Sequence, residues 1–325
     1  MRLRKLGERE LLALIRRHFS VPRKDVVLGI GDDAAVVNPG SGKLLVSKDL
    51  LVEDSDFIFR LQDPRLLGRK SLNVNLSDIA AMGGRPLHAV VGLALPAETD
   101  ETWLRQFMAG FRAAAREAGV ALVGGDLSQA DKIVIAVTVT GEAGSPVLRS
   151  GARPGDAIFV SGTLGDAAGG LRLLEKGGHR GVVKAVQPLI DAFLDPAPRL
   201  ELGALLARRK LASAMIDLSD GLSVDLAHIC EESGAGAEVE AERVPISVAL
   251  AHMARDPLAM ALNGGEDFEL LFTVRPRDVA AVERIASKHR LSRIGRITAG
   301  RRLVLIGPGG KKKPLRAKGF EHFVG

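Results

Sequence analysis

Six short islands in this chain place carboxylates beside glycine or small polar residues, and most of them follow or flank an apolar run. Carboxylates at the ends of packed strands, where glycine lets the backbone come close, suit a magnesium and phosphate site. The chain has no Gly-x-x-x-x-Gly-Lys-Ser/Thr loop, so the usual nucleotide-binding signature is excluded. In chain order the islands are Gly31-Asp32-Asp33, Ser47-Lys48-Asp49, Asn75-Leu76-Ser77-Asp78, Gly124-Gly125-Asp126, Asp217-Leu218-Ser219-Asp220-Gly221 and Gly264-Gly265-Glu266-Asp267.

The length of 325 residues and the hydrophobic content of 46% predict a globular protein of about two domains. Its apolar runs are far shorter than the roughly 20 residues that span a bilayer, so no membrane segment is expected. The first 24 residues are basic, but Glu8 and Glu10 interrupt them and no apolar signal core follows. We therefore expect a cytoplasmic protein.

Charge and cysteine content narrow the classes of partner and site. The 45 basic residues outnumber the 39 acidic ones, and this net charge of +6 favours anions at the surface. Aromatic residues make up only 4% of the chain, which leaves few stacking platforms, so no nucleic-acid partner is expected. We interpret the run 311–313, three lysines, as a solvated loop. Cys230 is the only cysteine, which excludes an internal disulfide and a multi-cysteine metal site, and we interpret it as an inert helix packing position.

Turn-forming residues cluster between 144 and 156, and this cluster predicts a domain boundary near residue 145. The first half mixes hairpin-like and helix-linked strands, whereas the second half has an α/β pattern. The predicted helices cover 7–19, 64–82, 99–118, 167–176 and 222–231. The predicted strands cover 26–30, 34–37, 44–47, 87–95, 120–123, 132–141, 157–161, 214–216 and 268–274.

The first island partly matches a dinucleotide fingerprint, with Ala34 at the position of the last glycine. The residues after it indicate a strand and a turn, whereas a true fingerprint starts a helix. Asp32 and Asp33 would also repel a pyrophosphate, unless a metal ion lies between them and the phosphate. Taken alone, this pair is either a turn feature or a pair of metal ligands.

The other islands also have two interpretations each. Asp49 follows a predicted strand and Asp126 stands where another ends, so each is either a turn residue or a ligand. Asp78 lies in a helical stretch among apolar neighbours, where a buried charge needs a partner. Ser219 or Asp220 is either a plain helix N-cap or part of a phosphate site. Two carboxylates about 4 Å apart repel by roughly 4 kcal/mol at an effective dielectric near 20, so islands that converge require a cation.

The order of the islands and the residues within them resemble the motifs of the thiamine-monophosphate kinase family, within the aminoimidazole-ribonucleotide synthetase superfamily. The resemblance covers nearly the whole chain, because Gly7-Glu8, Arg149-Ser150-Gly151 and Lys318-Gly319-Phe320 also take part. It implies a two-domain α+β and α/β fold. Residues 1–145 would form an α+β domain that binds metal and ATP and pairs across a homodimer, and residues 146–325 an α/β domain that closes over nucleotide and substrate. The implied reaction moves the γ-phosphoryl group of ATP onto thiamine monophosphate, giving thiamine diphosphate and ADP.

Family likeness also implies roles for individual residues. The implied magnesium ligands are Asp32, Ser47, Lys48 through its main chain, Asp49, Asp78, Asp126, Asp217 and Asp220. The implied ATP contacts are Gly125, Asp126, Arg149 and Ser219, of which Asp126 and Arg149 join Asp217 as catalytic residues. The implied substrate contacts are Asp56, Glu266 and Phe320. Such chemistry needs little acid–base help, because a phosphate nucleophile is already ionised near neutral pH and catalysis rests on positioning and charge neutralisation.

The chain departs from the family at two positions. The family commonly has threonine where Lys48 stands and histidine where Asp56 stands. An aspartate beside an anionic substrate repels it unless a cation intervenes, so either a metal bridges the substrate phosphate or the substrate is shifted. Two alternatives to the kinase remain open. One is another ATP-dependent synthetase of the superfamily, although the chain lacks the terminal cysteines that selenium and hydrogenase-maturation chemistry require. The other is a magnesium–ATP sensor without turnover.

Overall fold

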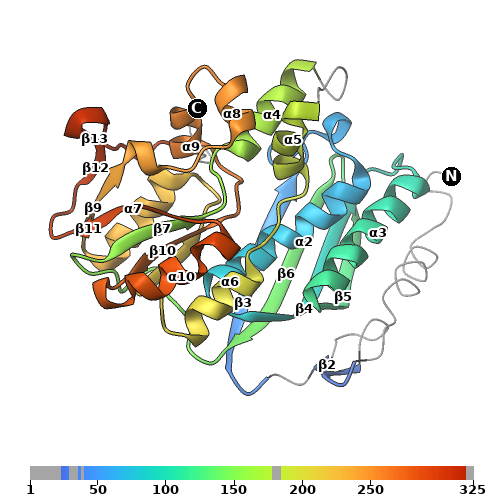
Figure 1. The fold of residues 1–325 in the computed structure, drawn as a ribbon. Helices are drawn as coiled ribbons and strands as arrows, with labels where there is room; N and C mark the ends of the chain where they lie inside the picture. The colour runs from blue at the N-terminus through green and yellow to red at the C-terminus, as the bar shows by residue number, and fades with distance from the viewer. Residues whose placement is uncertain (1–22, 29–35, 38–39, 178–183, 320–325) are drawn as a thin grey trace. The chain divides into compact units, whose positions relative to one another are not determined.

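The computed structural model describes residues 23–28, 36–37, 40–177 and 184–319, and Figure 1 shows its course. The chain forms two compact units that divide between Gly144 and Ser145, except that Ala80–Gly83 belongs to the second unit. The helix predicted over 7–19 lies outside the described residues. Within the described part, no helix is long and apolar enough to cross a membrane.

A four-stranded sheet forms the centre of the first unit. Its parallel pair β4–β5 is joined by a helix, as expected of a parallel crossover, and its other pairs are antiparallel. A short antiparallel pair, β1 (Val26–Leu28) and β2 (Val36–Val37), accompanies it. The order across the sheet is β3 (Lys43–Val52), β6 (Val134–Ala143), β4 (Arg85–Leu95) and β5 (Ala121–Gln129).

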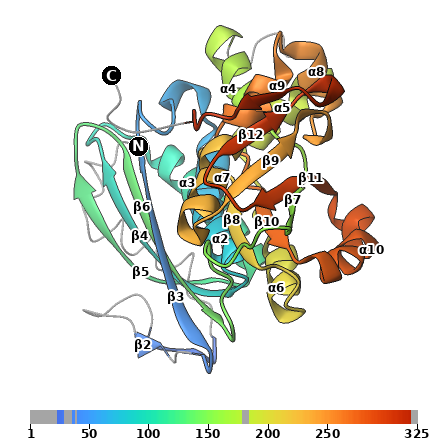
Figure 2. The same ribbon diagram turned by 90° about the vertical axis from the view of Figure 1, so that its left-hand side faces the viewer.

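Two long helices lie along one side of this sheet, as Figures 1 and 2 both show. They are α2 (Pro64–Ala81) and α3 (Glu101–Ala118), and they confirm the helices predicted over 64–82 and 99–118. Asp100 caps α3 by accepting a hydrogen bond from the amide of Thr102, and Gly119 ends it in the left-handed conformation. A turn of 3₁₀ helix, η2 (Phe59–Leu61), precedes α2.

Strand β3 runs on beyond the predicted end at residue 47, and β5 beyond the predicted end at residue 123. Asp49 and Asp126 therefore lie inside strands, and the prediction that they stand just after strand ends was wrong. The physical reason is pairing: Asp49 is held opposite Val137 and Asp126 opposite Gly92, so the neighbouring strands keep these polar segments extended.

A seven-stranded sheet forms the centre of the second unit. Only β9–β12 is a parallel pair, and the other five pairs are antiparallel. The order is β13 (Lys312–Pro314), β12 (Leu303–Ile306), β9 (Gly236–Glu240), β11 (Leu291–Thr298), β7 (Ala157–Ser161), β10 (Leu270–Val274) and β8 (Ala214–Asp217). The run 311–313, predicted to be a loop, thus enters the edge strand β13, where Lys312 pairs with Glu238.

Helices pack on both faces of this sheet. On one face α7 (Leu222–Ser233) buries Leu226 and Ile229 against strand residues such as Val160. On the other, α6 (Leu200–Arg208) and α10 (Val279–His289) pack over Phe159 and Phe272, whose rings stack at 5.7 Å. The remaining helices are α4 (Asp166–Gly177), α5 (Gln187–Leu194), α8 (Val248–Met253) and α9 (Pro257–Asn263), and the short 3₁₀ turns are η3 (Lys184–Val186), η4 (Ala241–Arg243), η5 (Pro276–Asp278) and η6 (Pro308–Gly310).

Two glycines let α2 and α3 approach each other. A Cβ atom on Gly110 would lie 1.8 Å from the carbonyl oxygen of Arg65, and one on Gly68 would lie 2.0 Å from that of Phe107. Both obstacles are backbone atoms, which cannot move aside without shifting a helix. We expect Gly110→Ala to lower the free energy of unfolding by about 1–3 kcal/mol, because overpacking outweighs the gain in helix propensity.

Thermal unfolding of purified variants measures this effect. Gly300→Ala is the control, because a Cβ atom there meets nothing within 4 Å. Equal melting temperatures for the two variants would contradict the close packing of α2 on α3.

Candidate functional site

Side chains of α2 bind the outer strand of the four-stranded sheet. The side-chain oxygen of Asn75 accepts a hydrogen bond from the amide of Asp49 at 3.0 Å, and the Ser47 hydroxyl donates to Asp78. The side-chain NH2 group of Asn75 also donates to the backbone carbonyl of Ser71 at 3.1 Å. Asn75 and Asp78 are three residues apart and so share a helix face. The second and third islands therefore meet, and the half-buried charge of Asp78 has Ser47 as a partner.

Negative charges accumulate where these islands meet. Burial, and then the negative charges of Asp78 and Asp56, raise the pKa of Asp49 to about 7. Asp56 lies close because its carboxylate accepts a hydrogen bond from the amide of Val52 at 2.8 Å, which closes the turn after β3. Lys48 alternates to the opposite side of β3 and is exposed. The group Asp49, Asp56 and Asp78 is thus an electrostatically unfavourable cluster of carboxylates.

The fourth island lies within β5. A Cβ atom on Gly125 would lie 2.2 Å from the carbonyl oxygen of Val91, so this position admits only glycine without movement of β4. Asp126 is exposed and stands opposite Gly92 on the neighbouring strand. Gly125 therefore has a packing reason that is independent of any ligand.

The fifth island forms a second group of carboxyls in the second unit. Asp217 ends β8 and is 3% exposed. Asp225, on the first turns of α7, is buried, and its pKa is raised to about 8 by burial and then by the charges of Asp220 and Asp217. The hypothesis that Ser219 or Asp220 caps α7 was wrong. Gly221 occupies the cap position without a side-chain hydrogen bond.

Asp225 takes over the role that a capping side chain usually has. Its carboxylate accepts hydrogen bonds from the amides of Asp220 at 3.2 Å and Gly221 at 3.0 Å. The sequence analysis missed this residue. Its signal is an aspartate inside the first turns of a helix, four residues after a glycine, where it can reach back to the preceding loop.

The sixth island runs beside the fifth. The amide of Glu266 donates to the carbonyl of Ser219 at 2.7 Å, and that of Phe268 donates to Leu218 at 2.8 Å. Glu266 and Phe268 both have positive φ angles, 69° and 48°, which non-glycine residues adopt rarely. Such conformations persist only where the surroundings hold them, and they cluster at functional loops.

The other carboxylates of this island have structural partners. Asp267 accepts hydrogen bonds from the amides of Gly165 and Ala167, at 2.6 and 3.2 Å, at the start of α4. Glu269 is buried and bonds with Ser161 and Arg199. Asp267 and Glu269 therefore have structural roles, and Glu266 is the acidic residue of this island that the family resemblance assigns to substrate.

The chain near residue 318 also reaches the fifth island. Lys318 and Ser223 exchange hydrogen bonds, from the amide of Lys318 to the hydroxyl at 3.1 Å and from the hydroxyl to its carbonyl at 3.2 Å. Gly319 lies so close that a Cβ atom would be 2.2 Å from the carbonyl oxygen of Asp220. Two predicted site residues, Asp32 and Phe320, lie outside the described residues.

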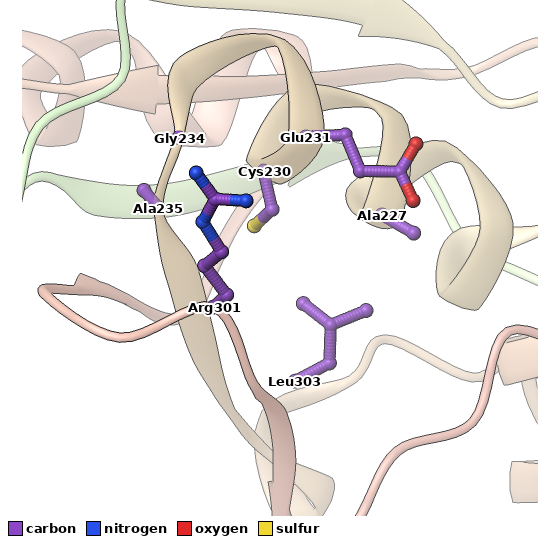
Figure 3. Close-up of a pocket in the computed structure, with 7 residues that line it drawn as sticks. All are labelled: Ala227, Cys230, Glu231, Gly234, Ala235, Arg301 and Leu303. Carbon is purple, nitrogen blue, oxygen red and sulfur yellow. The ribbon is translucent and has the colours of Figure 1, made fainter.

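One pocket in the second unit contains none of the predicted site residues (Figure 3). It has a volume of about 190 Å³ and lies between α7 and the segment leading into β12. Cys230 lines it, but burial and the charge of Glu231 raise the pKa of its thiol to about 11, so little reactive thiolate forms near neutral pH. This agrees with an inert packing position. Its lining residues are Ala227, Cys230, Glu231, Gly234, Ala235, Arg301 and Leu303.

Each unit contains one cluster of carboxylates, Asp49, Asp56 and Asp78 in the first and Asp217, Asp220 and Asp225 in the second. Neither cluster is a preformed metal centre. In the ranges that the structure describes, no three acidic, histidine or cysteine side chains are already arranged to hold a metal ion. Their chemistry nevertheless suits a hard cation, because carboxylate and hydroxyl oxygens are the ligands that magnesium prefers.

Comparison with known proteins shows the family. Residues 31–143 match the family model described as AIR synthase related protein, N-terminal domain, and residues 153–308 match the corresponding C-terminal domain. Thiamine-monophosphate kinase of Escherichia coli strain K12 is 38% identical over 325 residues, covering 98% of each chain. That of Aquifex aeolicus is 36% identical over 329 residues, covering 99% of this chain and all of the relative. The chain belongs to the thiamine-monophosphate kinase family. The resemblance found in its motifs is thereby confirmed.

Solved structures of thiamine-monophosphate kinases confirm the two-domain fold. The enzyme of Stenotrophomonas maltophilia K279a matches with a TM-score of 0.83 and 39% identity, over 93% of this chain and 96% of that one. The structure of AaThiL complexed with AMPPCP and TMP matches with a TM-score of 0.80 and 36% identity over 99% of both chains. Hydrogenase maturation protein HypE, at 24% identity and a TM-score of 0.76, shares the fold alone.

The crowding around Asp49 generates a prediction on metal binding. We expect Asp49→Asn to raise the melting temperature in EDTA by about 2–4 °C, because one repelling charge is removed. Magnesium should then stabilise the variant less than it stabilises the unaltered protein, because a ligand is lost. Thermal unfolding with and without magnesium at about 10 mM measures both effects.

Asp54→Asn is the matched control, because Asp54 is exposed in the same turn and pairs with Lys132 instead. A variant at Asp49 that is less stable in EDTA, yet keeps the full response to magnesium, would show that this carboxylate is structural.

Proposed function

We propose that the protein phosphorylates thiamine monophosphate, using ATP and magnesium, by direct in-line transfer. The observation that carries this proposal is the match, over 82–99% of the chain, to thiamine-monophosphate kinases at 34–42% identity. A relative of this kind, AaThiL, has been solved with AMPPCP and TMP, and AMPPCP is an ATP analogue that cannot pass on its γ-phosphate. The protein is therefore a phosphotransferase with a phosphate group as acceptor, and it works where ATP is available, in the cytoplasm.

The crowded carboxyls support a role in holding magnesium. In the first unit the candidates are Ser47, the main chain of Lys48, Asp49 and Asp78, together with Asp32 and Asp126, and in the second they are Asp217 and Asp220. Magnesium bound there would neutralise the phosphate charge that develops during transfer. The raised pKa values of Asp49 and Asp225 indicate that neutralising the charge at these places would stabilise the protein.

The chain's own groups then have the task of positioning. Arg149 is exposed and supplies a fixed positive charge for the phosphates of ATP. Gly125 lets those phosphates come close to the backbone, and Ser219 lies in the loop that Asp225 holds. The acceptor phosphate needs no strong base, because it is already ionised. This explains why the proposed site consists of aspartates and arginine, with no histidine or cysteine among them.

Substrate contacts are assigned to Glu266, Phe320 and Asp56. Glu266 has a positive φ angle, and its amide donates to the carbonyl of Ser219, so its backbone is fixed beside the fifth island. The carboxylate of Asp56 already accepts a hydrogen bond from the amide of Val52. Its effect on the substrate is therefore the negative charge that it adds near Asp49. A metal ion held by these carboxylates would remove their repulsion of the substrate phosphate.

Product analysis tests the function. Purified protein is incubated with magnesium, ATP and thiamine monophosphate, and the products are separated by chromatography. We expect thiamine diphosphate and ADP in equal amounts. ADP without thiamine diphosphate would indicate another ATP-dependent synthetase, and neither product would indicate a magnesium–ATP sensor.

Two variants show whether the activity belongs to the proposed site. Asp217→Asn should lower kcat by at least about 100-fold, the scale of losing electrostatic stabilisation of a transition state. Asp156→Asn is the control, because Asp156 is equally buried in the same unit but bonds with Arg153 and Ser213. Equal losses in the two variants would argue against a role of Asp217 in catalysis.

We further propose that the open face of the four-stranded sheet pairs with a second copy of the chain. Four large apolar side chains on this face are 42 to 64% exposed, namely Leu44, Val46, Leu50 and Val90. The first three alternate along β3, and Val90 shares their face because Lys48 and Val90 both stand opposite Thr138. Contiguous exposed apolar surface of this kind marks an interface.

Light scattering after size-exclusion chromatography tests the pairing. The unaltered protein should have twice the mass of the chain, and Val46→Arg/Leu50→Arg should have the mass of one chain, because two charges would be buried at the interface. Val248→Arg is the control, since Val248 is 73% exposed in the other unit. A double variant that keeps the mass of a dimer would place the interface elsewhere.

A further inference from the structure

The last residue of α7 is bound to the loop that carries Arg149. The hydroxyl of Ser233 accepts hydrogen bonds from the amides of Gly151 and Ala152, at 3.2 and 3.1 Å. It also donates to the carbonyl oxygen of Arg149 at 3.4 Å. One side chain thus contacts three backbone groups of a segment that is more than 80 residues away in the sequence. Ser233 is the only residue whose side chain the structure shows bonding to this segment, among those described.

The same loop is held at both of its ends. Before Arg149, the carbonyl of Leu148 accepts a hydrogen bond from the amide of Met215 at 3.0 Å. After it, Gly151 has a φ angle of 122°, a region that other residues rarely adopt, and Ala152 is buried in the core beneath α7. The side chain of Arg149 itself is exposed, and no described residue forms an ion pair with it. The backbone is therefore ordered while the guanidinium is left for a ligand.

From this arrangement we propose that Ser233 is a positioning residue for nucleotide binding, acting through Arg149. The proposal rests on the proposed function only because that function assigns Arg149 as a contact of ATP. A loop that is ordered before binding loses little conformational entropy when the phosphates arrive, so its cation binds them more tightly. Without the Ser233 hydroxyl, two amides and a carbonyl lose their partner, and the loop must be ordered at the expense of binding energy.

The arrangement also gives α7 a task at each end. Asp225 on its first turns holds the loop with Ser219 and Asp220, and Ser233 on its last turn holds the loop with Arg149. The helix is 12 residues long, so its two ends are about 18 Å apart. It therefore fixes two segments of the second unit relative to each other. Both segments carry residues assigned to the nucleotide or its metal.

Equilibrium binding of magnesium with AMPPCP tests the proposal without needing turnover. We expect Ser233→Ala to raise the Kd for AMPPCP roughly 5- to 20-fold, as expected when a binding loop is no longer pre-ordered. The Kd for thiamine monophosphate should stay within about twofold. In steady-state assays the KM for ATP should rise while kcat changes little. Ser233→Thr keeps the hydroxyl and should restore tight binding.

Two further variants separate positioning from general damage. Ser287→Ala removes an exposed serine from the last turn of α10 and should bind like the unaltered protein. In an Arg149→Ala background, Ser233→Ala should have no further effect, because both changes remove the same contribution. The proposal is overturned if Ser233→Ala binds AMPPCP as tightly as the unaltered protein, or if its effect adds fully to that of Arg149→Ala. Absence of thiamine diphosphate in the product assay would refute the kinase but leave these binding results interpretable.

Discussion

Repulsion between carboxylates is the constraint on which the rest of this structure depends. In the first unit Asp49 lies near Asp56 and Asp78, and in the second unit Asp225 lies near Asp217 and Asp220. The pKa values of Asp49 and Asp225 are strongly raised. Such crowding costs stability, and either protonation of a carboxyl or a bound cation relieves it. In the proposed reaction, magnesium would supply the positive charge that both these carboxylates and the phosphates of ATP require.

Neutral hydrogen bonds hold these charges in position. Asn75 fixes the backbone at Asp49, Ser47 bonds with Asp78, and Ser233 binds the loop of Arg149. The residues of the sixth island have different roles. Asp267 and Glu269 make structural hydrogen bonds, whereas their neighbour Glu266 has a strained backbone conformation. The fold therefore provides the rigid frame that positioning catalysis requires, because little covalent or acid–base chemistry remains for side chains to perform.

Sequence reasoning succeeded where the signal is local. Pro64 as a helix start and the apolar run over 157–161 predicted α2 and β7 well, and the motif order predicted the family. It failed for Asp49 and Asp126, because pairing with neighbouring strands, which no local pattern encodes, extends β3 and β5 through polar residues. It also missed Asp225 and Ser233. Their partners are backbone groups of other segments, and only the folded chain brings those groups within reach.

Anomalous X-ray scattering from manganese tests the central claim most directly. Crystals grown with manganese, AMPPCP and thiamine monophosphate would reveal each metal independently of the protein density. The account predicts anomalous peaks about 2.0–2.3 Å from carboxylate oxygens of Asp49 or Asp78 and of Asp217 or Asp220, close to the distances that small divalent cations keep, and in contact with phosphate oxygens. Bound AMPPCP with no peak beside either group of aspartates would contradict it.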